Sequence, residues 1–187
     1  LGLRELLLED IHLDRQYWTV LATLSNLQVL KLYDVSGVQD HLSQFVNLTH
    51  LVLYGLEITV LPVLPSSLQQ LQVCYTDTVV DFNSFTNLTR LQTLDLTQAE
   101  DFRDLSLLAH MKDTLTSLNL SGTAISDLHT LSGLIHLKDL DLNGTGGVNL
   151  SPLASLPLRS LNLRGSCFVK NLGPLHNMGT LQVLDVS

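Results

Sequence analysis

One short pattern recurs along this chain: a leucine, two variable residues, a leucine, one variable residue, and then leucine or valine. The first leucines of its nine copies are Leu3, Leu27, Leu48, Leu68, Leu91, Leu115, Leu137, Leu158 and Leu181. The spacing between successive copies is nearly constant. Self-similarity at a nearly fixed period indicates a stack of similar structural units, each contacting only its neighbours.

The spacing within each copy predicts a short β-strand. Its second and third apolar residues are two positions apart, so they face the same side of a strand. One such strand cannot bury its apolar face alone, but stacking the units side by side forms a parallel sheet with a shared core. Between the strands, apolar residues recur at helical spacing, as in Leu128, Leu131 and Leu134, while Pro152 and Pro157 interrupt this pattern. The sequence therefore predicts return arcs of short 3₁₀ or irregular turns.

The sixth copy, residues 115–128, is the most regular and reads Leu-Thr-Ser-Leu-Asn-Leu-Ser-Gly-Thr-Ala-Ile-Ser-Asp-Leu. It resembles the leucine-rich repeat, of the short class of about 22 residues found in internalin-like, phosphatase-regulator-like and protist proteins. The resemblance covers the whole chain and implies an α/β solenoid, a curved horseshoe with a parallel sheet on its concave face and short arcs on its convex face. One departure is the family's asparagine eight residues after the first leucine, which none of the first eight copies carries. We expect residues 1–187 to form a single leucine-rich repeat domain of about nine repeats, and to be a fragment of a longer chain.

Composition narrows the classes of partner. The chain has 187 residues, of which 46 are leucine and 5% are aromatic, so leucine must fill most of the core. Its 18 acidic and 10 basic residues give a formal net charge of −8. Nucleic acids and anionic membranes require clustered Lys and Arg, so this balance disfavours both. The longest uncharged stretch, residues 58–76, contains two prolines and three glutamines, so we expect no membrane insertion.

The variable positions of the strands point away from the core and are expected to form the binding face. Positions two, four, six and seven after each first leucine should line the concave surface. Tyr33, Tyr54 and Tyr75 are evenly spaced at such positions and are expected on three adjacent strands, as an exposed aromatic stripe. Aromatic clusters of this kind are typical of binding hot spots, although tyrosine also simply favours strands. The residues beside the stripe that we expect to share in binding are Lys31, His50 and Val52.

Negative charge is the second feature of the predicted concave face. Eight acidic residues lie there against Lys31 and Arg164, which gives a net charge of −6. Such a field would attract a basic protein or peptide, with Asp95, Asp139 and Asp141 as secondary electrostatic contacts. The alternative is that Asp or Asn between the two leucines is ordinary repeat sequence, forming a ladder of side chains along one row.

Reactive side chains give no sign of catalysis in this sequence. None of the seven histidines has a second ligand at metal-binding spacing, so we expect no metal and no cofactor. Cys74 and Cys167 are four repeats apart, about 19 Å by stacking, which is too far for a disulfide. We expect Cys74 to face solvent on the concave side, where a flat sheet offers no pocket for a nucleophile and its base. The chain is therefore expected not to be an enzyme.

The sequence thus predicts a non-catalytic interaction or scaffold module that binds a protein or peptide on its concave face. One alternative is the substrate-recognition arm of a larger enzyme, such as a ubiquitin ligase. Another is a glycosylated, ligand-binding ectodomain, which would suit the five sequons at Asn47, Asn87, Asn119, Asn143 and Asn149. Two unpaired cysteines favour an intracellular, cytoplasmic location instead. The partner's identity and the oligomeric state stay open.

Overall fold

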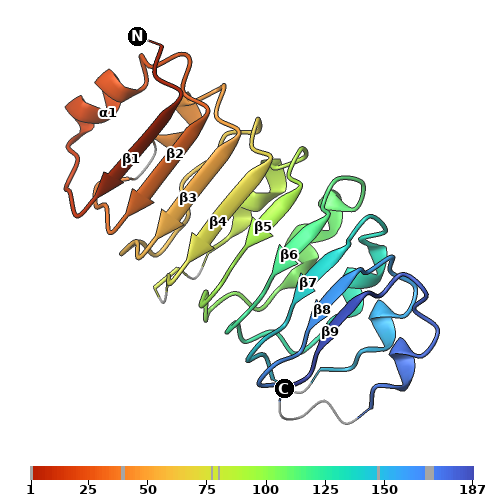
Figure 1. Ribbon diagram of the computed structural model, residues 1–187. Helices are drawn as coiled ribbons and strands as arrows, with labels where there is room; N and C mark the ends of the chain where they lie inside the picture. The colour runs from red at the N-terminus through yellow and green to blue at the C-terminus, as the bar shows by residue number, and fades with distance from the viewer. Residues whose placement is uncertain (1, 39–40, 77, 80, 147, 167–170) are drawn as a thin grey trace.

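The computed structural model describes residues 2–38, 41–76, 78–79, 81–146, 148–166 and 171–187. In this part of the chain, nine parallel strands form one sheet in which each strand pairs with the one before and the one after it (Figure 1). The strands are β1 (Glu5–Glu9), β2 (Val29–Tyr33), β3 (His50–Tyr54), β4 (Gln70–Cys74), β5 (Thr93–Asp95), β6 (Ser117–Asn119), β7 (Asp139–Asp141), β8 (Ser160–Asn162) and β9 (Val183–Asp185). Each contains the central leucine of one copy of the pattern, which confirms the predicted sheet. Figure 1 places β1 and β9 at opposite ends, so the sheet is an open solenoid and not a closed barrel.

The return arcs are short 3₁₀ helices in most units, as predicted. They are η1 (Leu42–Gln44), η2 (Asn83–Asn87), η3 (Leu105–Met111), η4 (His129–Gly133), η5 (Ser151–Leu153) and η6 (Gly173–Leu175). The first arc differs, because it contains an α-helix, α1 (Arg15–Leu21). Like the η2 and η3 segments, this one has no proline or glycine; its Trp18 and Leu21 fall three positions apart on the face that packs against the core. Trp18 is fully buried, with its ring stacked on that of His41 at a centroid distance of 5.7 Å.

The core is a column of leucines that depends on neighbouring units. The central leucines of β2 to β8 are at most 2% exposed, as Leu30, Leu118 and Leu140 illustrate. The equivalent Leu184 of β9 is 42% exposed, because it has a neighbouring strand on one side only in the described structure. Burial of the same residue type at the same position therefore depends on stacking between units, as expected for a solenoid.

One backbone position adopts the left-handed conformation in every unit from the first to the eighth. It lies seven positions after the first leucine, where the chain turns out of the sheet, and its φ angles range from 51° to 68°. Glycine adopts this conformation without steric cost, and four units have it there. The residues at this position, here called the turn row, are Asp10, Asp34, Gly55, Tyr75, Gln98, Gly122, Gly144 and Gly165.

Replacing Gly55 with alanine is expected to lower the free energy of unfolding by about 1 to 3 kcal/mol. Its φ is 65°, and an added Cβ would collide with the Asp34 carboxylate, which lies directly against it. Gly133→Ala is the matched control, because a Cβ there meets no atom within 4 Å and alanine favours the helical conformation of η4. Urea unfolding of both variants measures the difference. Equal stability of the two variants would show that the turn row imposes no such constraint.

Candidate functional site

Three tyrosine rings contact one another in series across neighbouring units. The ring centroids of Tyr33 and Tyr54 are 5.6 Å apart, and those of Tyr54 and Tyr75 are 4.8 Å apart. Tyr33 and Tyr54 are the last residues of β2 and β3 and are partners in the strand register. Both are partly exposed, and Tyr75 is 49% exposed. We call this set the tyrosine ladder; it lies at the arrowhead ends of the strands in Figure 1.

The expectation that Tyr75 lies on a strand beside Tyr54 is wrong. The register partner of Tyr54 is Cys74, the last residue of β4, and Tyr75 follows in the left-handed turn row with a φ of 54°. The first leucines Leu48 and Leu68 are closer together in sequence than the two tyrosines are, so the second tyrosine falls one position later in its unit. Tyr75 therefore reaches the ladder from the turn row, where a bulky L-residue is uncommon and strained.

The expectation that Cys74 faces solvent is also wrong. The residue is only 6% exposed, and its Sγ lies 3.8 Å from the backbone oxygen of Asp95. Its strand partner Tyr54 and its chain neighbour Tyr75 carry rings that contact each other beside it. Burial, with a smaller contribution from the charge of Asp95, raises the pKa of the Cys74 thiol to about 12. A thiol in this state is a poor nucleophile at neutral pH.

Native Cys74 is expected to react with iodoacetamide far more slowly than an unfolded cysteine. The test uses a Cys167→Ser background, because Cys167 lies outside the described residues and the chain has two cysteines. The folded state also holds the thiol proton more tightly than the unfolded state does. Cys74 therefore contributes to the free energy of unfolding in full below about pH 9, and this contribution is lost as pH rises toward about 12. Mass spectrometry of alkylation with and without urea measures the protection. Rapid labelling of the native protein at pH 8 would contradict it.

The other predicted contact residues lie beside the tyrosine ladder on β2 and β3. Lys31 pairs with Val52 in the strand register, and Val29 pairs with His50. The Lys31 ammonium donates a hydrogen bond of 2.7 Å to the Glu5 carboxylate, which raises the pKa of Lys31. Val52 and His50 are partly exposed. The structure therefore places these residues on neighbouring strands with Tyr33 and Tyr54, and Tyr75 joins them from the turn after β4.

The predicted acidic contacts lie elsewhere, on β5 and β7, and two of them have a structural role. Asp95 Oδ1 accepts hydrogen bonds from the backbone N–H and the hydroxyl of Thr97 at 3.0 and 2.6 Å. Asp141 Oδ1 accepts from the backbone N–H of Asn143 at 2.7 Å, and its Oδ2 accepts from Asn162 Nδ2 at 2.9 Å. The residues Asn119, Asn162 and Asp185 bond the backbone two positions on in the same way. This row therefore holds the turns together, and of the three acids only Asp139, exposed at the start of β7, lies outside it.

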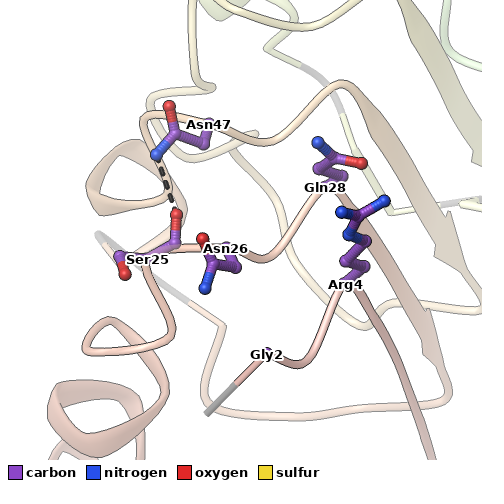
Figure 2. Close-up of a pocket in the computed structure, with 6 residues that line it drawn as sticks. All are labelled: Gly2, Arg4, Ser25, Asn26, Gln28 and Asn47. Carbon is purple, nitrogen blue, oxygen red and sulfur yellow. Dashed lines mark hydrogen bonds between the residues drawn. The ribbon is translucent and has the colours of Figure 1, made fainter.

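Figure 2 shows a hollow at the opposite edge of the sheet, where the first strands begin. Arg4, Gln28 and Asn47 are among the residues that line it. Asn47 Nδ2 donates a 2.8 Å hydrogen bond to the backbone oxygen of Ser25, and the backbone oxygen of Arg4 accepts from the N–H groups of Gln28 and Val29. These polar atoms join the first three units. The amide nitrogen of the Asn47 sequon is therefore engaged with the backbone.

A second hollow, of about 220 Å³, lies just beyond the tyrosine ladder. Its lining residues are Asp34, Val35, Ser36, Gly55 and Glu57. Two of them carry carboxylates, and Asp34 and Gly55 are the residues that directly follow Tyr33 and Tyr54. This edge of the sheet therefore combines exposed aromatic rings with negative charge.

Ser36 also takes part in a contact that the sequence did not predict. Ser36 Oγ and His12 Nδ1 are 2.8 Å apart, and His12 Nε2 lies 3.4 Å from Asp14 Oδ1. These are the residue types of a hydrolase triad, but His12 and Asp14 are both more than 60% exposed at their side chains. Asp34 and Glu57 line the same hollow as Ser36 and would repel a developing oxyanion. The contact joins the first two units, and its chemistry is poorly suited to acyl transfer.

Within the ranges that the structure describes, no group of three or more His, Cys, Asp or Glu side chains could hold a metal ion. In those same ranges, no helix has the length and apolar character that crossing a membrane requires.

Solved structures share this architecture. An internalin, InlF, from Listeria monocytogenes is 20% identical with a TM-score of 0.66, over 98% of this chain and 60% of that one. Internalin C2 from the same species is 25% identical with a TM-score of 0.66, over 89% of this chain and 74% of that one. The chain folds as a leucine-rich repeat solenoid. No protein-family model and no curated protein matches it.

A third similar structure is the leucine-rich repeat part of FLRT2, in an octameric complex with Latrophilin 3 and Unc5D. The identity is 23% and the TM-score 0.65, over 86% of this chain and 60% of that one. Two of these three matches thus cover less than two thirds of the neighbour's own length. At these identities, the comparisons establish the fold.

Proposed function

We propose that residues 1–187 form a single, non-catalytic leucine-rich repeat domain that binds a protein on its concave face. The proposed contact centre is the tyrosine ladder, together with Lys31, His50 and Val52. The observation that carries the proposal is the series of ring contacts that joins three exposed or partly exposed tyrosines on adjacent units. Tyrosine offers a large contact area at low conformational cost, so such a cluster suits a binding surface.

The position of Tyr75 also supports this proposal. Half of the units that carry the left-handed turn have glycine there, whereas the fourth unit has a half-exposed aromatic side chain. Strain of this kind persists where the side chain has a role that offsets it. The similar FLRT2 repeat structure, which was determined within a complex of proteins, is consistent with a protein partner. Asp139, together with Asp141 on the same strand and Asp95 on β5, is proposed as a secondary electrostatic contact.

Affinity enrichment from native extract tests this function with three baits: the wild-type domain, the Tyr33→Ala/Tyr54→Ala/Tyr75→Ala variant, and a Tyr17→Ala control. Tyr17 is 52% exposed on α1, so its loss removes an exposed tyrosine away from the sheet. A partner of the ladder should be enriched by the wild type and the control and lost with the triple variant. Partners that bind the triple variant as well as the wild type would overturn the proposal.

A further inference from the structure

We infer that the tyrosine ladder receives an arginine side chain of the partner protein, with the carboxylates of Asp34 and Glu57 as its counter-charges. This inference rests on the proposed binding function and specifies the chemistry of the partner. The counter-charges are Asp34 and Glu57 and not Asp95 and Asp141, because the last two already accept hydrogen bonds from turn backbone.

The turn row places negative charge next to the aromatic residues along the chain. Asp34 directly follows Tyr33, and its carboxylate occupies the space that a Cβ at Gly55, the next member of the turn row, would need. Tyr75 is the member after Gly55, so the carboxylate is on the same row as an exposed ring. Glu57 lines the same hollow as Asp34 and Gly55. The hollow that holds both carboxylates is therefore lined by the residues that directly follow Tyr33 and Tyr54, so a long side chain on the rings has both carboxylates as its nearest described acidic neighbours in the turns after β2 and β3.

The charges around the ladder are not balanced by the protein itself. Acidic residues on the concave positions of β1, β2 and the turns after them are Glu5, Glu9, Asp10 and Asp34. Among the described concave positions of β1 to β4, the permanent cation is Lys31, which is already paired with Glu5 at 2.7 Å. His50 is the other titratable nitrogen on this part of the face. A positive charge from a partner is therefore attracted here, and an acidic or phosphorylated partner is repelled.

Arginine suits this surface better than lysine does. A guanidinium group is planar, stacks on aromatic faces and donates paired hydrogen bonds to carboxylates. A lysine ammonium is compact and more strongly hydrated, so it gains less from the rings. Flat rings bordered by carboxylates thus favour a positive charge over a negative one, and a guanidinium group over an ammonium group.

Nuclear magnetic resonance of the isotope-labelled domain tests the inference directly with a defined probe. The probe is the peptide acetyl-Gly-Arg-Gly-Arg-Gly-amide, and its matched control has both arginines replaced by uncharged, nearly isosteric citrulline; a lysine version measures selectivity. We expect the arginine peptide to shift the amide resonances of Tyr54, Gly55 and Tyr75 and those of Asp34 and Glu57. The lysine peptide should bind more weakly, and the citrulline peptide should cause no comparable shifts.

A charge-neutralising variant separates this inference from general attraction to an acidic protein. Asp34→Asn/Glu57→Gln should weaken binding of the arginine peptide at least about fivefold, and asparagine tolerates the left-handed turn at position 34. Glu100→Gln/Asp113→Asn removes the same charge from exposed positions outside the strands and should leave affinity nearly unchanged. Thermal unfolding of both variants checks their folding.

The outcomes of these experiments distinguish the inference from the function on which it rests. Shifts spread over all acidic residues, equal effects of both charge variants, or equal binding of the citrulline peptide would overturn the arginine inference. If the natural partner is lost with the tyrosine variant but retained with Asp34→Asn/Glu57→Gln, the binding function stands and the arginine inference fails. If the natural partner survives the tyrosine variant, the binding function itself fails.

Discussion

Leu118→Ala is expected to lower the free energy of unfolding by about 2 to 5 kcal/mol. Leu118 is the central residue of β6 and is 1% exposed, with β5 on one side and β7 on the other. Truncation removes buried apolar area and leaves a cavity in a column where each unit contacts only its two neighbours. The loss therefore weakens two interfaces between units as well as the β6 unit itself.

Leu184→Ala is the matched control for this prediction, because the residue type and its position in the unit are the same. Leu184 is 42% exposed in β9, so its truncation should cost less than about 1 kcal/mol. Urea unfolding gives the two free energies, and hydrogen exchange at β6 shows whether the loss is local, since repeat arrays need not unfold in one step. Similar losses for the two variants would mean that stacking between units contributes little to stability.

The sequence predicted the sheet well because the repeat averages out local ambiguity. A single Leu-x-x-Leu-x-Leu segment is weak evidence for a strand, but nine copies at one period require a geometry that all of them can share. The strand register follows from the same alignment: Leu118 pairs with Leu94 and Leu140, the equivalent residues of the adjacent copies. The 3₁₀ arcs were likewise predictable from prolines and glycines in the later units.

Departures from the repeat were harder to predict, because each depends on local geometry. The helix α1 arises in the first arc, although the arcs that contain η2 and η3 lack proline and glycine as well. The first leucines Leu48 and Leu68 are closer together in sequence than Tyr54 and Tyr75 are. Cys74 therefore takes the last strand position, and Tyr75 falls in the turn row. An alignment by repeat position, instead of by the even spacing of the tyrosines, could have revealed that shift. The contact between Ser36 and His12 had no signal in the sequence, since it joins loops of two different units.

The acidic residues show why composition alone does not locate a site. Their number on the concave face predicted a basic partner, but not which carboxylates would meet it. The structure distinguishes two kinds of carboxylate: Asp95 and Asp141 accept backbone N–H groups, whereas Asp34 and Glu57 line a hollow. The alternating Asp and Asn side chains between the leucines thus fix the turns, whether or not they also contact a partner.

Replacing Tyr33, Tyr54 and Tyr75 with alanine is expected to lower affinity for the partner at least about a hundredfold. Hot-spot residues each contribute about 2 kcal/mol or more on truncation, and residues in contact do not contribute additively. Tyr54 contacts both other rings, so Tyr54→Ala alone should have the largest effect of the three single variants. Isothermal titration calorimetry with the purified partner measures these affinities, and circular dichroism checks folding.

The same calorimetric series includes a control variant and an outcome that would contradict the prediction. Tyr17→Ala truncates a 52% exposed tyrosine on α1 and should leave affinity within about twofold of the wild type. Tyr75→Ala relaxes only part of the turn-row strain, since alanine also disfavours a φ of 54°. The free energy of unfolding of this variant should therefore stay within about 1 kcal/mol of the wild type, while its affinity for the partner falls. A loss of binding with unchanged stability identifies a contact residue. If affinity instead falls only in proportion to a loss of folded protein, the tyrosine ladder is a structural feature and the partner binds another part of the solenoid.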